Sequence, residues 1–445
     1  MRTGIGLSTA AVLLGSTVAL QANAQPQRER FRISGQVQTE QQAVDPRTGR
    51  PPPPPRFSEA PTGFDNLTNG FLPQGPDFDT LEDDAVVPLR SFNDDRFIFE
   101  EVEVVRDGLG PIYNAQSCRE CHQNVATGGA SQIAEHRTGH MTNGAFFESQ
   151  GGSLIGSRTT HPDIQERVVF EDSIRTFRIS TNTLGAGYVE AIANPTLMAI
   201  RLAQPSSMRG SIVLAPVLEA GSLPRIGRFG WKSQHASLES FAADAYLNEM
   251  GITSPLFPEE NTSSGINVSY PSDYDPVPEP EDDGVDVKAF ADFMRSTKAP
   301  SRGPITADVL SGETLFKNIG CATCHVPTIP TSPPGTPING GKLVVPEALG
   351  NKLIHPYADF LMHDIGTGDG IPVQPTPELA STASQIRTAP LWALRTRNRL
   401  MHDGLTFTER EAIERHAGQA TAVTQRFKAL SAADQTLLLK FLDSL

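Results

Sequence analysis

Apolar residues recur at helical spacing in several stretches of this chain, and one such stretch leads directly into a pair of cysteines. Leu310, Leu315, Phe316 and Ile319 fall on one face of a helix, and Cys321 follows two residues later. We therefore expect an amphipathic helix that ends immediately before this cysteine.

Four further helices are predicted, and two of them begin with a capping box. They start after Pro195, near Val287, at Thr408 and at Ser431. Glu411 follows Thr408 by three residues, and Asp434 follows Ser431 at the same spacing, where a hydroxyl caps the first turn. Asp434 replaces the Glu or Gln that is usual at that position.

Strands and loops are expected between these helices. Arg167–Ile179 and Ser211–Leu218 are rich in β-branched and aromatic residues, which favours strands. Residues 271–284 are acidic and broken by prolines, and residues 326–346 are rich in proline and glycine, so both predict loops. The pattern as a whole predicts a mainly α fold with irregular loops and some β.

The N-terminal 60 residues differ from the rest of the chain. Residues 1–24 have a positive start, a short apolar run and a small-x-small end, which is typical of a secretory signal peptide; a membrane anchor is the alternative. Residues 25–60 include five consecutive prolines, which favour an extended tether. No later segment is apolar for long enough to span a bilayer, so we expect a periplasmic protein without a membrane span in its mature chain.

Composition narrows the class of protein. A length of 445 residues predicts two or three domains. The formal net charge of −14 argues against nucleic acid as a partner. It is compatible with docking of a small basic redox protein.

All four cysteines lie in two C-x-x-C-H motifs, Cys118–His122 and Cys321–His325. Two thiols three residues apart can form thioether bonds to both vinyl groups of one haem, and the following histidine then ligates the iron. A zinc ribbon, a redox dithiol and buried structural cysteines are the alternatives. None explains why a histidine follows both pairs, so two covalently bound c-type haems are predicted. Cys118 and Cys121 would attach one haem, with His122 as its iron ligand, and Cys321 and Cys324 the other, with His325 as its iron ligand.

The sixth position of each iron decides function, because a strong ligand gives an electron-transfer centre and an open position lets an oxidant bind. His416 is the best candidate, since the helix that begins at Thr408 would place it on the same inner face as Ala412 and Ile413. A core histidine bonded to backbone is the alternative for His416.

The chain resembles the di-haem oxidoreductase branch of the bacterial di-haem cytochrome c peroxidase superfamily, whose members are also described as thiol oxidoreductases. The resemblance is spread over residues 60–445 and is carried by five segments: Gly108–His122, Gly227–Lys232, Met250–Phe257, Arg387–Trp392 and Met401–Gly404. It implies two cytochrome c-like domains with one haem each, here residues 61–300 and 301–445. The thiol label gains no support, because every cysteine is committed to haem.

Several site residues follow from the resemblance. Relatives ligate the second iron with a methionine 14 residues after the histidine of a His-Asp-Gly segment; here that position is His416, which implies bis-His ligation and a lowered potential. For the first iron, His140, His136 and Met141 are candidate ligands, or the position is open. Relatives also bind calcium near the segment that is Arg397–Met401 here, but two arginines there do not support it.

The catalytic residues are less clear from the family pattern. Relatives carry a glutamate where this chain has Leu197, so Glu190 is the candidate acid/base for peroxide cleavage, with a surface or capping carboxylate as the alternative. Trp231, and less so Trp392, could shorten electron transfer between haems, although a packed core tryptophan is the common case.

The resemblance implies a periplasmic peroxidase-type oxidoreductase. Electrons would enter at the C-terminal haem from a c-type cytochrome or cupredoxin and reach a catalytic N-terminal haem, where hydrogen peroxide or a similar oxidant is reduced. Two alternatives stay open: an enzyme that oxidises a protein or organic substrate by high-valent haem chemistry, and a non-catalytic electron carrier.

Overall fold

The computed structural model describes residues 56–63, 89–373 and 377–445. The predicted signal peptide and most of the proline-rich tether lie outside these residues. Pro55–Leu445 form one compact unit. Within the described residues, no helix combines the length and apolar character needed to cross a membrane.

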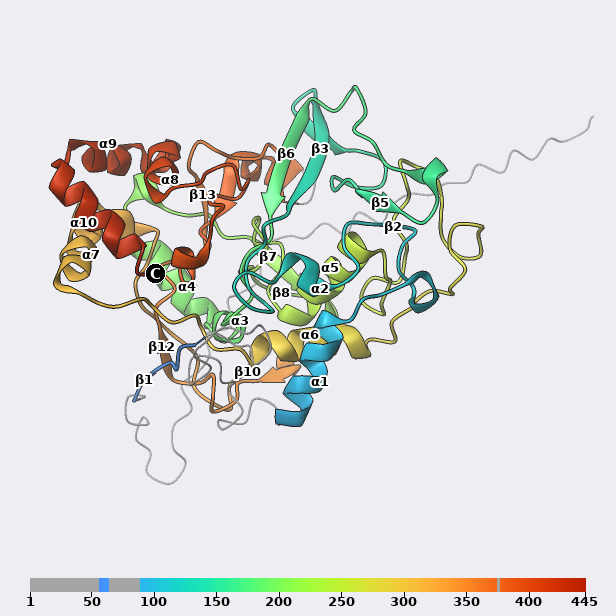
Figure 1. The fold of residues 1–445 in the computed structure, drawn as a ribbon, viewed down its shortest axis with the longest axis horizontal. Coiled ribbons are helices and arrows are strands. Elements are labelled where there is room, and N and C mark those ends of the chain that lie inside the picture. Colours follow the sequence, from blue (N-terminus) through green and yellow to red (C-terminus); the bar gives the residue numbers. More distant parts are fainter. Residues whose placement is uncertain (1–55, 64–88, 374–376) are drawn as a thin grey trace, which may run out of the picture. The chain divides into compact units, whose positions relative to one another are not determined.

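The helices and strands are mostly short and are joined by long loops (Figure 1). The α-helices are α1 Leu89–Glu100, α2 Cys118–Cys121, α3 Ala186–Glu190, α4 Asn194–Ala203, α5 Leu238–Met250, α6 Val285–Arg295, α7 Ala307–Ile319, α8 Glu409–Arg415, α9 Thr421–Ala429 and α10 Ala432–Leu442. The strands are β1 Ser58–Glu59, β2 Ile112–Tyr113, β3 Ala134–Thr142, β4 Ala145–Glu148, β5 Arg158–Thr159, β6 Ile174–Ile179, β7 Leu214–Val217, β8 Leu223–Ile226, β9 Ile329–Pro330, β10 Pro337–Ile338, β11 Leu343–Val344, β12 Lys352–Ile354, β13 Met362–Asp364 and β14 Gln385–Arg387.

The predicted helices are confirmed, together with both capping interactions. Thr408 Oγ1 accepts from the Glu411 amide at 3.2 Å, and Ser431 Oγ accepts from the Asp434 amide at 3.1 Å. The helix that begins at Thr408 ends one residue earlier than expected, so that His416 is its C-cap.

Only part of the first predicted strand forms. β6 begins at Ile174, because the chain turns at Val169–Asp172, where the Asp172 amide bonds to the Val169 carbonyl. Phe170 within this turn is 93% exposed, so the apolar residues there do not reach a core. β6 pairs antiparallel with β3, which also pairs with β4. The second predicted strand forms in part, as β7, which pairs antiparallel with β8.

Two large groups of buried apolar residues form most of the core of the described residues, beside three small ones. The larger one joins α1, α5 and α6 to residues from 329 to 392, and therefore draws on both sides of position 300. Residues 293–300 themselves are buried, and Thr297 Oγ1 accepts a hydrogen bond from the Gly185 amide at 3.0 Å. The chain passes position 300 inside the packed structure.

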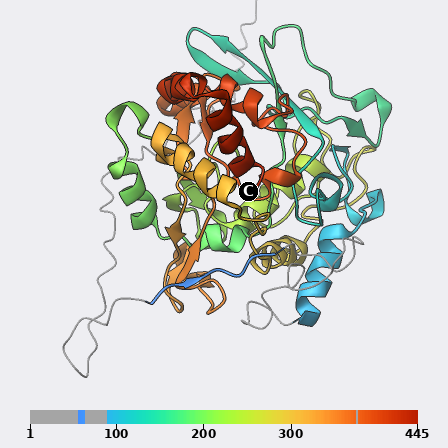
Figure 2. The same cartoon turned by 60° about the vertical axis from the view of Figure 1, so that its left-hand side comes forward.

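The smaller core lies between α7, α9 and α10. α7 and α10 lie side by side in both views (Figures 1 and 2). Gly312 allows this close approach, because a Cβ at that position would lie 2.0 Å from the Leu437 carbonyl oxygen. This pair of helices positions the second C-x-x-C-H motif at the end of α7.

Candidate haem sites

The second motif begins where α7 stops. Gly320 ends the helix with a left-handed φ of 99°, a conformation that glycine adopts without strain. Cys321–Thr323 then form a single turn, and His325 follows. The helix end and the glycine together direct this turn away from the α7 axis.

His325 and His416 are paired across this site. Their ring centroids are 6.4 Å apart. Nδ1 of His325 donates to the Tyr357 carbonyl at 2.9 Å, and Nδ1 of His416 donates to the Ala412 carbonyl at 2.6 Å. Each ring therefore keeps Nε2 as its free nitrogen, the arrangement by which a backbone carbonyl orients a ligating imidazole.

The spacing of these two rings fits one metal ion between them. A metal about 2 Å from each Nε2 would hold the two ring centroids about 6 Å apart. Burial and the neighbouring His416 lower the pKa of His325 to about 4, and burial lowers the pKa of His416 as well. Both rings are thus neutral, which is the form that binds a metal.

A hydrogen-bonded chain adjoins the second cysteine of this motif. Cys324 Sγ lies 3.7 Å from His363 Nδ1, and His363 Nε2 donates to Asp359 Oδ2 at 2.8 Å. Burial alone would lower the pKa of His363, but its bonds to Asp359 and Cys324 raise it to about 10. These three residues bring potential metal-ligand atoms together. Since Cys324 belongs to the haem motif, the group is part of the haem surroundings.

The first motif lies on the short helix α2. Ser117 Oγ caps it by accepting from the Glu120 amide at 3.2 Å. His122 follows the helix and donates from Nδ1 to the Gly129 carbonyl at 3.1 Å, and the Thr181 backbone makes a further hydrogen bond with the ring. The Phe99 ring packs against it, with centroids 6.3 Å apart. Burial lowers the pKa of His122, so it too is neutral.

The three candidate ligands for the first iron lie on or near the β3–β4–β6 sheet. His140 faces Asp172, with Nδ1 3.3 Å from Oδ1, and stacks on Phe147. His136 stacks on Phe177 with ring centroids 5.0 Å apart. Met141 is 46% exposed. The sixth ligand of this haem stays a prediction.

The thiols of Cys121 and Cys321 are not activated nucleophiles. Burial and the charges of Glu249 and Glu135 raise the pKa of Cys121 to about 12, and burial raises the pKa of Cys321 to about 12. A redox dithiol works through a thiolate of lowered pKa. The dithiol alternative is therefore disfavoured at both motifs.

Glu190 is fully buried at the end of α3 and is held by several donors. Arg295 donates from Nε to Oε2 at 2.8 Å and from Nη2 to Oε1 at 3.1 Å. Leu238 N and Asn339 Nδ2 also donate to Oε1, at 2.8 and 2.9 Å. Burial alone would raise the pKa of Glu190, but Arg295 holds it below the usual value. This environment favours a structural carboxylate over a proton carrier.

The two tryptophans have different surroundings. Trp231 donates from Nε1 to the Ile179 carbonyl at 2.7 Å and packs edge-on against His402 with ring centroids 6.1 Å apart. Trp392 is 4% exposed and belongs to the larger core; its Nε1 has no hydrogen-bond partner among the described residues. Trp231 therefore links β6 to the His402 segment, and a role for it in electron transfer stays a prediction.

A group of charged residues that the sequence does not reveal adjoins the first motif. Arg137 contacts Glu135 at 2.8 Å and Glu249 at 3.9 Å. Burial and the charge of Glu135 raise the pKa of Glu249. The two carboxylates come from β3 and α5, so no local sequence pattern connects them.

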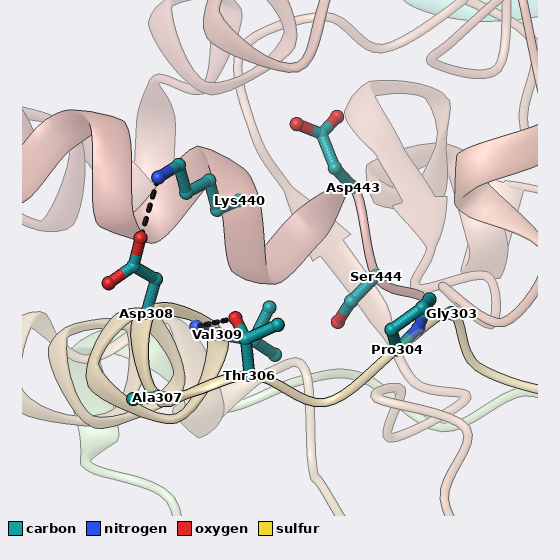
Figure 3. Close-up of a pocket in the computed structure, with 9 residues that line it drawn as sticks. All are labelled: Gly303, Pro304, Thr306, Ala307, Asp308, Val309, Lys440, Asp443 and Ser444. Carbon is teal, nitrogen blue, oxygen red and sulfur yellow. Dashed lines mark hydrogen bonds and ion pairs between the residues drawn. The ribbon is translucent and has the colours of Figure 1, made fainter.

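An open surface pocket lies between the start of α7 and the end of α10 (Figure 3). Lys440 and Asp308 form an ion pair across it, with Nζ 2.6 Å from Oδ2. The pocket is at the opposite end of α7 from Cys321, so it does not belong to the haem site. At Arg397–Met401, burial lowers the pKa of Arg397 to about 10, and nothing there favours calcium.

A search among curated proteins found no similar sequence. Among solved structures, the chain matches a MauG-like protein associated with microbial copper homeostasis, at 14% identity over 87% of this chain and 93% of that one, with a TM-score of 0.38. It matches the dihaem peroxidase BthA from Burkholderia thailandensis E264 at 15% identity over 57% of this chain and 77% of that one, with a TM-score of 0.29. It also matches a hydrazine synthase chain from Kuenenia stuttgartiensis at 19% identity, with a TM-score of 0.25. This match covers 38% of this chain and spans 57% of the hydrazine synthase chain.

The profile of one protein family, described as "Di-haem oxidoreductase, putative peroxidase", matches residues 147–445. That range holds the second haem motif, both paired histidines and most of the larger core. The match covers well over half of the chain, and the chain therefore belongs to the di-haem oxidoreductase family.

Proposed function

We propose that this protein is an exported peroxidase-type oxidoreductase with two covalently attached c-type haems. Cys118 and Cys121 would attach one haem and Cys321 and Cys324 the other. The signal-peptide pattern of residues 1–24 supports export to the periplasm, where such attachment occurs. The family supports an oxidoreductase with two haems.

The pairing of His325 with His416 carries this proposal. When bound, the haems supply one-electron redox chemistry, and an iron with two imidazole ligands suits electron transfer more than substrate binding. Both rings are oriented through Nδ1 by backbone carbonyls, so little rearrangement is needed when the oxidation state changes. We infer that the C-terminal haem receives electrons from a small redox protein, a c-type cytochrome or a cupredoxin.

The N-terminal haem is the proposed site of the oxidant, hydrogen peroxide or a related molecule. His122 is anchored on one side by the Gly129 carbonyl and by Phe99. The histidines predicted for the other side are engaged with Asp172, Phe147 and Phe177. This difference between the two sites supports a division into an electron-transfer haem and a catalytic haem.

Three measurements on the purified mature protein test the proposal. Mass spectrometry after denaturation should give the mass of the polypeptide plus two haems. Electron paramagnetic resonance of the half-reduced protein should show one haem accessible to ligands. Peroxide should then be consumed together with a reduced cytochrome. Two low-spin haems in every redox state would contradict catalysis and favour an electron carrier.

A further inference from the structure

Three carboxylates meet in the long loop between α5 and α6, away from both haem motifs in sequence. Glu260, Asp275 and Glu281 each bring one potential ligand oxygen within 4.8 Å of the other two. The last of these residues lies just before α6. The loop that holds the group includes the acidic, proline-broken residues 271–284.

Each of the three carboxylates uses one oxygen within the protein. Glu260 Oε1 accepts from the Asn261 amide at 3.1 Å, and Asp275 Oδ1 accepts from the Val277 amide at 2.9 Å. Glu281 Oε2 accepts from both the amide and the hydroxyl of Thr253. These bonds fix the direction in which each carboxylate points.

The second oxygen of each group is buried and unpaired. Glu260 Oε2, Asp275 Oδ2 and Glu281 Oε1 have no hydrogen-bond partner among the described residues. Asp275 is only 4% exposed, so water does not solvate its unpaired oxygen freely. A buried carboxylate oxygen without a partner costs free energy, and three of them together favour a shared cation as the partner.

The pKa shifts of the three carboxylates also favour a bound cation. Burial and the charge of Glu281 raise the pKa of Glu260 to about 9, with Asp275 and Glu279 adding to the effect. Burial likewise raises the pKa of Asp275 and of Glu281. The charged neighbours that act on Glu260 are carboxylates, and no lysine or arginine of the described residues is among the causes that act on any of the three groups.

We propose that Glu260, Asp275 and Glu281 bind one divalent cation of the calcium type. Calcium is a hard ion that takes six to eight oxygen ligands at about 2.4 Å, so oxygens on opposite sides of it lie about 4.8 Å apart. Magnesium demands shorter, octahedral contacts and keeps more of its water, so it fits this group less well. The site is separate from Arg397–Met401.

A cation here would hold the loop that leads into α6. Phe290 of that helix packs on Phe99 with ring centroids 6.0 Å apart, and Phe99 packs on His122. The cation site is therefore connected through packed side chains to the ligand of the first haem. Binding should stabilise this part of the fold.

Titration calorimetry tests the proposal. It uses the haem-loaded protein from which a chelator has removed free divalent cations. Calcium chloride should bind with one site per chain, and magnesium chloride should bind at least about tenfold more weakly. Asp275→Asn should weaken calcium binding about tenfold or more. Asp273→Asn makes the same charge change two residues away on an exposed side chain and should bind calcium as the native protein does.

Thermal unfolding gives a second readout, because calcium should raise the melting temperature of Asp273→Asn and not that of Asp275→Asn. Without calcium, Asp275→Asn should be at least as stable as the native protein, because a buried charge beside two other carboxylates is removed. With calcium, the native protein and Asp273→Asn should gain stability and Asp275→Asn should not. If Asp275→Asn does not fold, Glu260→Gln replaces it. Absence of calcium binding by the native protein, or equal loss in both aspartate variants, overturns the proposal.

Discussion

Glu190 and Arg295 form a fully buried ion pair with two hydrogen bonds, Nε to Oε2 at 2.8 Å and Nη2 to Oε1 at 3.1 Å. The pair joins the end of α3 to the end of α6. Leu238 and Asn339 contribute the remaining donors, so the carboxylate connects four separate segments. Its position explains why a charged group is tolerated inside the larger core.

The first prediction concerns Glu190→Gln. The variant leaves the buried Arg295 guanidinium with only the partly exposed Asp292 as a counter-charge, which should cost about 3 kcal/mol of unfolding free energy. Denaturant unfolding measures the loss, and peroxide turnover per folded molecule should change little. Glu171→Gln, on an exposed turn, is the control and should leave stability unchanged. A large loss of turnover without loss of stability would instead support the proton-carrier role.

The same pair predicts a pH dependence. Because the folded protein holds the pKa of Glu190 below its usual value of 4.5, the ion pair stabilises the fold above that value. Its contribution is lost as the pH falls through the folded-state pKa. The stability gap between native protein and Glu190→Gln should therefore narrow on acidification below pH 4.5, as denaturant titrations at several pH values would show.

Substitution of His416 tests the ligand pair. His416→Ala should leave one iron with an open position and convert one of two haems to a high-spin absorption spectrum. His416→Met should restore low-spin ligation but raise the reduction potential of that haem, because a thioether favours the reduced iron. His355→Ala, which removes an exposed histidine paired with Glu59, should leave both spectra and potentials unchanged.

Trp231→Phe separates packing from electron transfer. Phenylalanine keeps an aromatic ring beside His402 but loses the bond to the Ile179 carbonyl, so we expect a stability loss of about 1 kcal/mol. If Trp231 shortens the path between haems, stopped-flow electron transfer between them should slow. Trp392→Phe removes an indole N–H that has no partner among the described residues, and serves as the matched comparison.

Gly312→Ala should force α7 and α10 apart. The added methyl group would lie 2.0 Å from the Leu437 carbonyl oxygen, well inside van der Waals contact. We expect a loss of about 2 kcal/mol in unfolding free energy. Gly303→Ala is the control, since its nearest neighbour would be 3.6 Å away. Equal melting temperatures for the two variants would contradict the close approach of the helices.

Local patterns were sufficient to predict α4, α6, α7, α8 and α10, but α1, α5 and α9 were not predicted. Helical spacing places α7, and capping boxes place the starts of α8 and α10. His416 could be proposed as a ligand because its helix and its distance from His402 are both visible in sequence. Each of these features is set by residues that lie close to one another in the sequence.

Long-range partners could not be predicted in the same way. Arg295 lies far from Glu190 in sequence, and nothing near either residue indicates the pair. The Tyr357 and Gly129 carbonyls that orient His325 and His122 are backbone atoms, which leave no trace in residue identity. The turn at Phe170 was missed because its apolar residues resemble a buried strand, although they are exposed.

The burial of residues 293–300 limits the relative motion that the two halves of the fold can make. A hinge needs a few residues that can change their backbone angles. At this junction Thr297 and Ala299 are buried, and Thr297 is hydrogen-bonded to Gly185. We therefore expect the separation of the two irons to be set once, when the chain folds, and not adjusted by swinging of two halves during each turnover.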